Sequence, residues 1–561
     1  MKIPKNLSFV RSNQLVDIKI IYDQSKQVVV FMHNGLPFTT QTLDALMFKN
    51  STKEKEEDNT GNFTTGFMSS HILSRVVPIN GPFLINNQGT WELLYISATI
   101  YFEGTSEKQI KEEFTKMEES KTFDRFDPNN EEHQWTKFTY PLTNEISIQS
   151  ANLGIQSFRD NIFQFLLFCD EINSIQFNDE EPIFISAVST SNHLYQTLIK
   201  QNIFKNIQVI EKTIDYQKTD DYEKQRKFII ATIDNPNNQY SLKYSKDHKI
   251  EYIERNLKYS IAFEIDSKNS LVNLKPNKIC FFGNLPLIGS EKYQFPFLLS
   301  SPQFATLAEG NGIILDENLV DANNILTNTG LNSLIINSSI ELFKHVLQWL
   351  IHSNCSNFVS FSHSLLFDDQ TVPQMKPFLM NIRKILENSK IVHNQDNAQI
   401  VFKDAFILDT SVKNPVEFYM LTSQIYSNLV SFQECLQWQN KTWETISILN
   451  IDTFASHIDH IGKDPLFNPT TNQNSFQLSY KLFKNGLNPL QEDDLRFLIQ
   501  LYTFLLNEES ENVDQQNSVF HKHSIILNSN NEFSTLQNLR TDTKCTEDFK
   551  KLMDLCTNPS W

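Results

Sequence analysis

Apolar and polar residues alternate in several short stretches of the first 150 residues, and this period of two predicts β-strands. Residues 16–22 and 28–32 alternate on either side of a polar turn, which predicts a hairpin. An apolar cluster at 43–48 predicts a short helix, and further alternation predicts strands at 93–102 and 135–140. This part of the chain therefore predicts a sheet with a few helices.

Strands and helices alternate irregularly through the middle of the chain, and helices dominate its last third. A continuous apolar run at 162–168 predicts a helix that leads into a strand at 174–177. Apolar residues recur at helical spacing over 341–352, which predicts an amphipathic helix. Beyond residue 405 the longest predicted helices cover 416–438 and 493–506. The pattern as a whole predicts an α+β protein.

Composition narrows the class of protein. A chain of 561 residues is long enough for several domains, and its 44 phenylalanines predict phenylalanine-rich cores. The net charge of −17 disfavours nonspecific binding to nucleic acid. No apolar run is long enough to predict a membrane span, and the first twenty residues lack the apolar stretch of a signal peptide. Six widely spaced cysteines predict reduced thiols. We therefore expect an intracellular protein, cytoplasmic or nuclear.

Residues 60–71 form the most informative segment, a glycine-bearing loop that runs into a predicted helix. Gly61 and Gly66 permit backbone angles that side chains forbid, and Phe67 begins an apolar run. Backbone N–H groups at a helix start, aided by the helix dipole, can hold phosphate. The charged segment 51–59 lies just upstream and lacks apolar periodicity, which suits a lid. An ordinary capped loop is the alternative interpretation of the same residues.

Other chemistry-bearing residues predict little. His457, Asp459 and His460 lie close enough for metal ligation, but no matching further ligand accompanies them. Cys169 follows an apolar helix face and is expected in a core. Neither a nucleophile elbow nor a P-loop occurs in the sequence. We therefore assign no catalytic residue and no metal ligand.

Several motifs together resemble the sacsin-like branch of the GHKL ATPases, which have the Bergerat fold and include the ninety-kilodalton heat-shock chaperone. The chain has His-Asn-Gly-Leu-Pro-Phe-Thr at 33–39, Ser-Thr-Lys at 51–53, and Gly-Asn-Phe-Thr-Thr-Gly-Phe-Met-Ser-Ser-His-Ile-Leu-Ser at 61–74. These match the family's turn, lid and phosphate loop in order. Residues 282–291 and 528–539 resemble two later family segments. The resemblance therefore spans most of the chain.

The resemblance implies a nucleotide-binding, chaperone-like protein with ATP, as Mg-ATP, as its cofactor and protein clients as its partners. It implies three parts: a partial GHKL ATPase domain at 1–150, a transducer-like middle domain at 151–405, and a mostly helical region at 406–561. Asn34, Gly35 and Thr136 would lie near adenine. The phosphates would meet backbone N–H groups of the glycine-bearing loop, at Gly61, Phe63, Thr65, Gly66 and Phe67. His71 is expected to pack rather than to touch ligand.

Two departures from the family pattern bear on activity. The family begins with a helix whose Glu activates water and whose Asn holds magnesium, and no Glu-x-x-x-Asn pair occurs before residue 16. Thr64 stands where the family has the middle glycine of its phosphate loop, and its branched side chain adds bulk there. We therefore expect weak or absent hydrolysis. A missing first exon, a natural pseudo-ATPase used as a noncatalytic scaffold, and a helix supplied by a partner chain are the three explanations.

Overall fold

The structure is a computed structural model of the 561-residue chain. The residues that it describes are 15–48, 70–87, 90–104, 106–190, 207–216, 225–246, 249–274, 278–283, 285–307, 312–315, 319–320, 326–362, 365, 372–439, 441–463, 492–509, 518–527 and 533–538.

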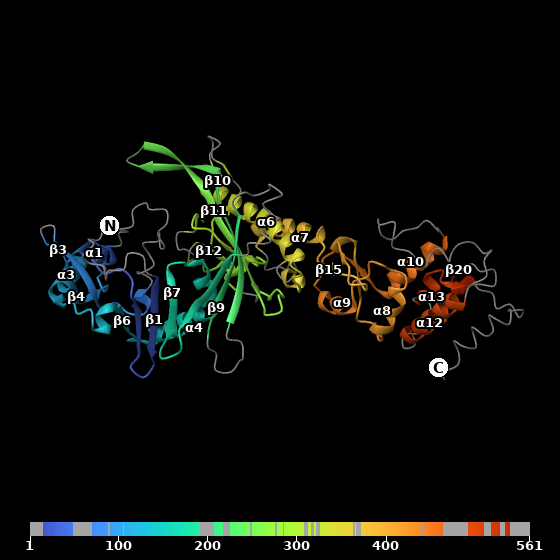
Figure 1. The fold of residues 1–561 in the computed structure, drawn as a ribbon, viewed down its shortest axis with the longest axis horizontal. Helices are drawn as coiled ribbons and strands as arrows, with labels where there is room; N and C mark the ends of the chain where they lie inside the picture. Colours follow the sequence, from blue (N-terminus) through green and yellow to red (C-terminus); the bar gives the residue numbers. More distant parts are fainter. Residues whose placement is uncertain are drawn as a thin grey trace, which may run out of the picture. The chain divides into compact units, whose positions relative to one another are not determined.

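The chain divides into two compact units. The first comprises residues 1–356 with 369–378, and the second comprises residues 357–368 with 379–561. The first unit carries one mixed sheet of fourteen strands among its described residues, and helices accompany it (Figure 1). The predicted mixed α and β class is confirmed. The predicted division at residues 150 and 405 stays a prediction, and residue 150 itself falls inside a long helix.

The N-terminal half of the sheet has strand order β1-β2-β6-β3-β4-β5, and all of its neighbouring strands are antiparallel. The strands are β1 (Val16–Asp23), β2 (Val28–His33), β3 (Val76–Asn87), β4 (Thr90–Tyr101), β5 (Thr122–Arg125) and β6 (Thr136–Pro141). The strands predicted from alternation at 16–22, 28–32, 93–102 and 135–140 are thus confirmed.

Three helices cover one face of this half sheet: α1 (Thr40–Phe48), α3 (Glu107–Ser120) and α4 (Glu145–Phe168). Leu43 of α1, Met117 of α3 and Ala151 of α4 belong to one buried apolar cluster with inward side chains of β3, β4 and β6. Asn144 caps the start of α4 by accepting a hydrogen bond from the N–H of Ser147. The layers are therefore one sheet and one set of helices.

The sheet continues beyond β1 through a parallel ladder with β7, and the remaining order is β7-β8-β9-β10-β11-β14-β12-β13. These strands are β7 (Ile172–Phe177), β8 (Ile183–Thr190), β9 (Ile207–Asp215), β10 (Gln225–Lys246), β11 (Lys249–Ile265), β12 (Phe281–Gly283), β13 (Leu285–Pro286) and β14 (Leu298–Ser300). Helix α6 (Asn328–His352) contacts β11 and contains the predicted amphipathic segment 341–352.

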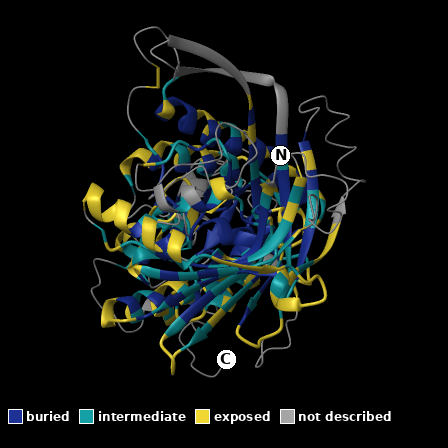
Figure 2. Ribbon diagram, turned by 90° about the vertical axis from the view of Figure 1, so that its left-hand side faces the viewer, coloured by how far each residue is buried: buried dark blue, intermediate teal, exposed yellow. Residues whose placement is uncertain are grey.

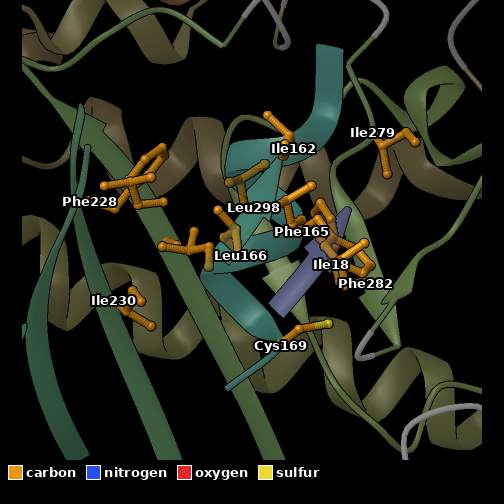
Figure 3. Packing of buried hydrophobic residues seen from close by; sticks show 14 of the residues in the cluster. Ile18, Ile162, Phe165, Leu166, Cys169, Phe228, Ile230, Ile279, Phe282 and Leu298 are labelled. Carbon is orange, nitrogen blue, oxygen red and sulfur yellow. The ribbon is translucent and has the colours of Figure 1, made fainter. Parts of the chain in front are cut away.

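Helix α4 ties the two halves of the sheet together through its C-terminal turns. Ile162, Phe165 and Leu166 pack against Ile18 of β1 and Phe228 of β10 in a second buried cluster (Figure 3). Figure 2 shows buried residues along the strands and exposed residues on outer helix faces and in turns. Apolar side chains therefore fill the space between α4 and the central strands.

A buried lysine caps the end of α4. Lys212 on β9 is 5% exposed, and its Nζ donates to the carbonyl of Leu167 at 2.9 Å and to the carboxylate of Asp170 at 2.6 Å. Carbonyls in the last turn of a helix lack intrahelical partners, and a cation there also complements the helix dipole. Cys169, in the same turn, is buried as predicted.

The second unit is built from short helices and two-stranded ladders. Its described α-helices are α7 (Lys376–Glu387), whose first three residues belong to the first unit, and α8 (Pro415–Ser423), α9 (Phe432–Trp438), α10 (Ile451–Lys463), α12 (Glu492–Glu509) and α13 (Val519–Lys522). Its ladders pair β15 (Val392–His393) with β16 (Gln399–Ile400), β17 (Phe406–Leu408) with β18 (Ser447–Leu449), and β19 (Ile526–Leu527) with β20 (Phe533–Ser534).

The single helix predicted at 416–438 is wrong, because α8 and α9 are separate. Between them the chain turns so that Val430 donates its backbone N–H to Phe406 of β17. That pairing requires extended backbone at Leu429 and Val430, which a continuous helix would not provide. The stacked rings of Phe418 on α8 and Phe504 on α12, 5.3 Å apart, then close the core of this unit.

Candidate functional site

The end of β2, the start of β6 and the middle of β3 meet at one place in the N-terminal half sheet. His33, the last residue of β2, pairs directly with Thr136, the first residue of β6. On the other side of β6, Asn80 pairs with Lys137, so that Gly81 lies beside Thr136. The turn Asn34–Gly35 follows at once. The structure therefore brings three of the predicted adenine-side residues, Asn34, Gly35 and Thr136, to one end of the sheet.

Thr136 carries a buried hydroxyl without a hydrogen-bond partner among the described residues. The residue is 1% exposed, and its Oγ1 is fully enclosed. An unsatisfied buried hydroxyl costs on the order of 1–3 kcal/mol, and such groups are few in folded proteins. The hydroxyl has no exposed surface in this structure, so a bound molecule would reach it only after its surroundings open.

Gly81 allows the close approach of β3 to Thr136. A Cβ atom at position 81 would lie 2.9 Å from Cα and 3.1 Å from Oγ1 of Thr136, which is closer than such atoms pack. Gly81 is not among the site residues predicted from the sequence. The sequence feature that could have indicated it is a glycine inside a strand, because such a glycine often marks a place where a ligand or another backbone approaches the strand closely.

His33 is neutral at physiological pH. Burial lowers the pKa of His33 to about 4. Its Nδ1 accepts a hydrogen bond from the N–H of Gly35 at 3.2 Å, and its ring lies within 6.2 Å of the ring of Phe138, centroid to centroid. The histidine thus fixes the turn after β2 as an uncharged ring, and it adds no charge next to Thr136.

The Asn34 side chain is engaged by Asp17 at the start of β1. Its Oδ1 accepts from the backbone N–H of Asp17 at 2.7 Å, and its Nδ2 donates to the Asp17 carboxylate at 2.9 Å. The same carboxylate accepts hydrogen bonds from Asn173 and Ser174 of β7. Because both ends of the Asn34 amide are engaged, this side chain holds the turn in place.

The predicted phosphate loop lies outside the described residues. This holds for Gly61, Phe63, Thr65, Gly66 and Phe67. The described chain resumes at a single 3₁₀ turn, Ser70–Ile72, and leads through Ser74 into β3. His71 packs its ring against Phe102, with the centroids 3.9 Å apart, in agreement with the packing role expected for it.

The described residues contain no group of three or more His, Cys, Asp or Glu side chains arranged to hold a metal ion. In the second unit, His457 instead accepts or donates a hydrogen bond at 2.8 Å to the hydroxyl of Tyr426. In the described segments no helix is long and apolar enough to cross a membrane. A cavity of about 650 Å³ lies at the opposite end of β1, and none of the predicted site residues lines it.

Comparisons with known proteins find only distant structural similarity. No protein-family model matches the chain, and no curated protein matches it. Among solved structures, the chain is similar to the ATPase and transducer domains of DNA topoisomerase II from Balamuthia mandrillaris, with 11% identity, 42% of this chain and 54% of that chain covered, and a TM-score of 0.21.

Two structures of the ATPase region of topoisomerase II from Saccharomyces cerevisiae also match, each at 9% identity. The one bound to ICRF-187 (dexrazoxane) covers 37% of this chain and 55% of its own, with a TM-score of 0.20. The other covers 42% and 56%, with a TM-score of 0.16. This chain thus spans about half the length of the solved chains that it matches. At these scores the similarity establishes neither a family nor an activity.

Proposed function

We propose that this chain is a GHKL-type nucleotide-binding protein of the sacsin-like group, chaperone-like in function, and that it binds ATP with weak or absent hydrolysis. The proposal rests on two supports: the linked motifs at 33–39 and 61–74, and the meeting of β2, β6 and β3 around Thr136. The single observation that carries it is the direct pairing of His33, which precedes the Asn34–Gly35 turn, with Thr136 on β6.

Each residue at this end of the sheet has a definite part in the proposed site. Thr136 would hydrogen-bond the edge of the base, and Gly81 keeps the space beside it free of a side chain. The neutral His33 ring and the Asp17–Asn34 pair hold the turn rigid, so that binding costs little ordering of the protein. The bound nucleotide would supply the phosphates, and the glycine-bearing loop at 61–67 would present backbone N–H groups to them.

Hydrolysis is expected to be weak in this 561-residue chain. Thr64 occupies the position of the middle glycine in the phosphate loop, and a branched side chain restricts the backbone there. Turnover depends on the exact placement of the phosphates more than binding does, so this substitution is expected to lower turnover more than binding.

Calorimetric titration of the 561-residue protein with ATP and ADP, with and without magnesium, tests the proposal. Saturable binding of ATP that Thr136→Val weakens is the expected result. A matched control is Thr139→Val, because Thr139 lies on the same strand with its side chain on the opposite face. The absence of saturable binding at millimolar ATP would reject the nucleotide site, and rapid turnover in a phosphate-release assay would reject the weak-hydrolysis part.

A noncatalytic interaction scaffold is the second candidate, and one observation favours it. Both hydrogen-bonding ends of the Asn34 side chain are held by Asp17, so the side chain that follows β2 cannot bond a base without breaking that pair. A scaffold would capture partner proteins equally well with and without ATP. A strong nucleotide effect on capture would reject this candidate.

A further inference from the structure

A cleft lies at the hairpin end of β1, between that strand and α4. Its volume of about 650 Å³ falls within the range of ligand-binding pockets. Tyr22 lines it from the strand, Gln24 from the hairpin turn, Asn152 and Gln156 from the helix, and Asn178 and Asp179 from the turn after β7. We call it the hairpin-end cleft. Asp17, beside the proposed nucleotide site, is six residues from Asp23 along β1, or roughly 20 Å at the usual strand rise.

The cleft exists because β1 extends beyond the end of its parallel neighbour, β7. The β1–β7 ladder ends at the pair Ile20–Phe177, whereas β1 continues to Asp23. At Asn178 the chain takes a left-handed conformation, with φ of 47°, and turns away. The last part of β1 therefore has an antiparallel neighbour, β2, on one side and the cleft on the other.

The pattern of ladder bonds shows which backbone groups of β1 face the cleft. The Val16 N–H donates to the carbonyl of Glu171, and the Ile20 carbonyl accepts from Asn178, so even-numbered residues point toward β7. Odd-numbered residues bond β2, as the bond from the N–H of Asn34 to the Asp17 carbonyl shows. This alternation directs the carbonyl of Tyr22 and the N–H of Gln24 into the cleft.

These two groups are placed as a parallel partner strand requires. A residue opposite Asp23 in a parallel ladder would donate its N–H to the Tyr22 carbonyl and accept from the Gln24 N–H. No hydrogen bond to either group is found within the described ranges. The Tyr22 N–H already donates to the side-chain Oδ1 of Asn178 at 2.7 Å. Asn178, in the turn after β7, therefore makes the last described hydrogen bond on this side of β1, and the Tyr22 carbonyl and the Gln24 N–H beyond it stay open to a partner.

The charges of the cleft favour a cationic partner over an anionic one. Arg159 is bound in a bidentate manner to Glu180, at 2.6 and 3.1 Å, and its guanidinium lies 4.3 Å from the centre of the Phe177 ring. This cation is therefore committed. The exposed carboxylate of Asp179 lines the cleft, and Asp23 lines it too, with Lys26 beside it at 3.1 Å.

We propose that the hairpin-end cleft binds a short extended peptide segment by parallel strand addition to β1, with a basic side chain opposite Asp23 and apolar side chains on either side of it. The flanking side chains would point to the α4 wall, where Ile155 lies between Asn152 and Gln156. Main-chain bonds give affinity in this kind of recognition, and alternate side chains give specificity. The inference does not rest on the proposed nucleotide site.

Fluorescence anisotropy of the full chain with a labelled peptide tests this inference. The probe is Ac-Gly-Thr-Val-Lys-Val-Thr-Gly-amide. One companion peptide carries Glu in place of Lys, and the other carries a methyl group on the backbone nitrogen of Lys. Saturable binding of the probe, weakened at least tenfold in either companion, is the expected result. The N-methyl group removes the donor to the Tyr22 carbonyl and blocks close approach of the two backbones there, so a loss of binding reports strand addition.

Two protein variants locate the binding. Asn152→Trp places a bulky ring in the cleft from an exposed helix position, and we expect at least a tenfold loss with an unchanged melting temperature. Asp179→Lys should reverse the preference for Lys over Glu, whereas the same charge change at exposed Asp124 on β5 should not. Absence of saturable binding, or binding that neither N-methylation nor Asn152→Trp weakens, overturns the inference.

Discussion

Replacing Thr136 by valine should stabilise the nucleotide-free protein and weaken nucleotide binding at the same time. The hydroxyl is enclosed and unpartnered among the described residues, and the residue is 1% exposed. Leaving such a group unsatisfied costs about 1–3 kcal/mol, and a methyl group of the same shape removes most of that cost. Valine is also well suited to a strand. We expect a gain of about 1 kcal/mol in the free energy of unfolding.

The loss of the same hydroxyl should weaken the binding of ATP, although it stabilises the nucleotide-free protein. A net hydrogen bond of about 0.5–1.5 kcal/mol to the base corresponds to roughly a twofold to tenfold loss of affinity for ATP. Urea unfolding without nucleotide and calorimetric titration with ATP measure the two effects, with Thr139→Val as the control. Destabilisation by 1 kcal/mol or more would show that the hydroxyl has a partner in solution. Unchanged ATP affinity in a stabilised variant would show that it does not meet the base.

Three further predictions test other parts of the structure. Gly81→Ala should lower the free energy of unfolding by about 1–2 kcal/mol, because its Cβ would overlap the backbone of Thr136. An unchanged midpoint of urea unfolding would contradict that overlap. Burial lowers the pKa of His33 from 6.5 to about 4, so the unfolded chain takes up this proton first as pH falls below 6.5. The free energy of unfolding should therefore decline between pH 6.5 and 4, by on the order of 3 kcal/mol, and His33→Gln should lessen the decline in a pH series of melting curves. Lys212→Met should lower the free energy of unfolding by about 1–2 kcal/mol, because it leaves the Leu167 carbonyl at the end of α4 without its donor. Asp170→Asn, at an exposed carboxylate, should lower it by less than about 0.5 kcal/mol. Equal losses in calorimetric melting would assign the effect to the ion pair instead.

Local sequence pattern predicts the strands that alternate and misses those that do not. Residues 16–22 and 28–32 carry a clear period of two, and β1 and β2 lie there. Strand β3 contains Pro78, Gly81 and Pro82, which interrupt any alternation, and the strand is formed by pairing with β4 and β6. Helix α3 is mostly charged on its outer side, so its few inward residues give little signal before the β4 surface is in place.

The sequence motifs single out Asn34, Gly35 and Thr136, but they do not predict how these residues are arranged, and they do not include Gly81. The motif at 33–39 indicates a turn after a strand, and the structure places Asn34 and Gly35 there. The pairing of His33 with Thr136 depends on the register between strands more than a hundred residues apart, which no local pattern contains. The Asp17–Asn34 bonds arise only once β1 and β2 pair, so the engagement of the Asn34 amide was not predictable from the motif.

The position of β1 in the sheet has a consequence for how the first unit comes apart. This strand is hydrogen-bonded to β2 on one side and to β7 on the other, and it alone joins the two halves of the described sheet. Opening either half exposes one of its ladders, but only complete unfolding of both halves frees it entirely. Its amide protons should therefore be among the last of this unit to exchange with deuterated water, at a rate that tracks global unfolding.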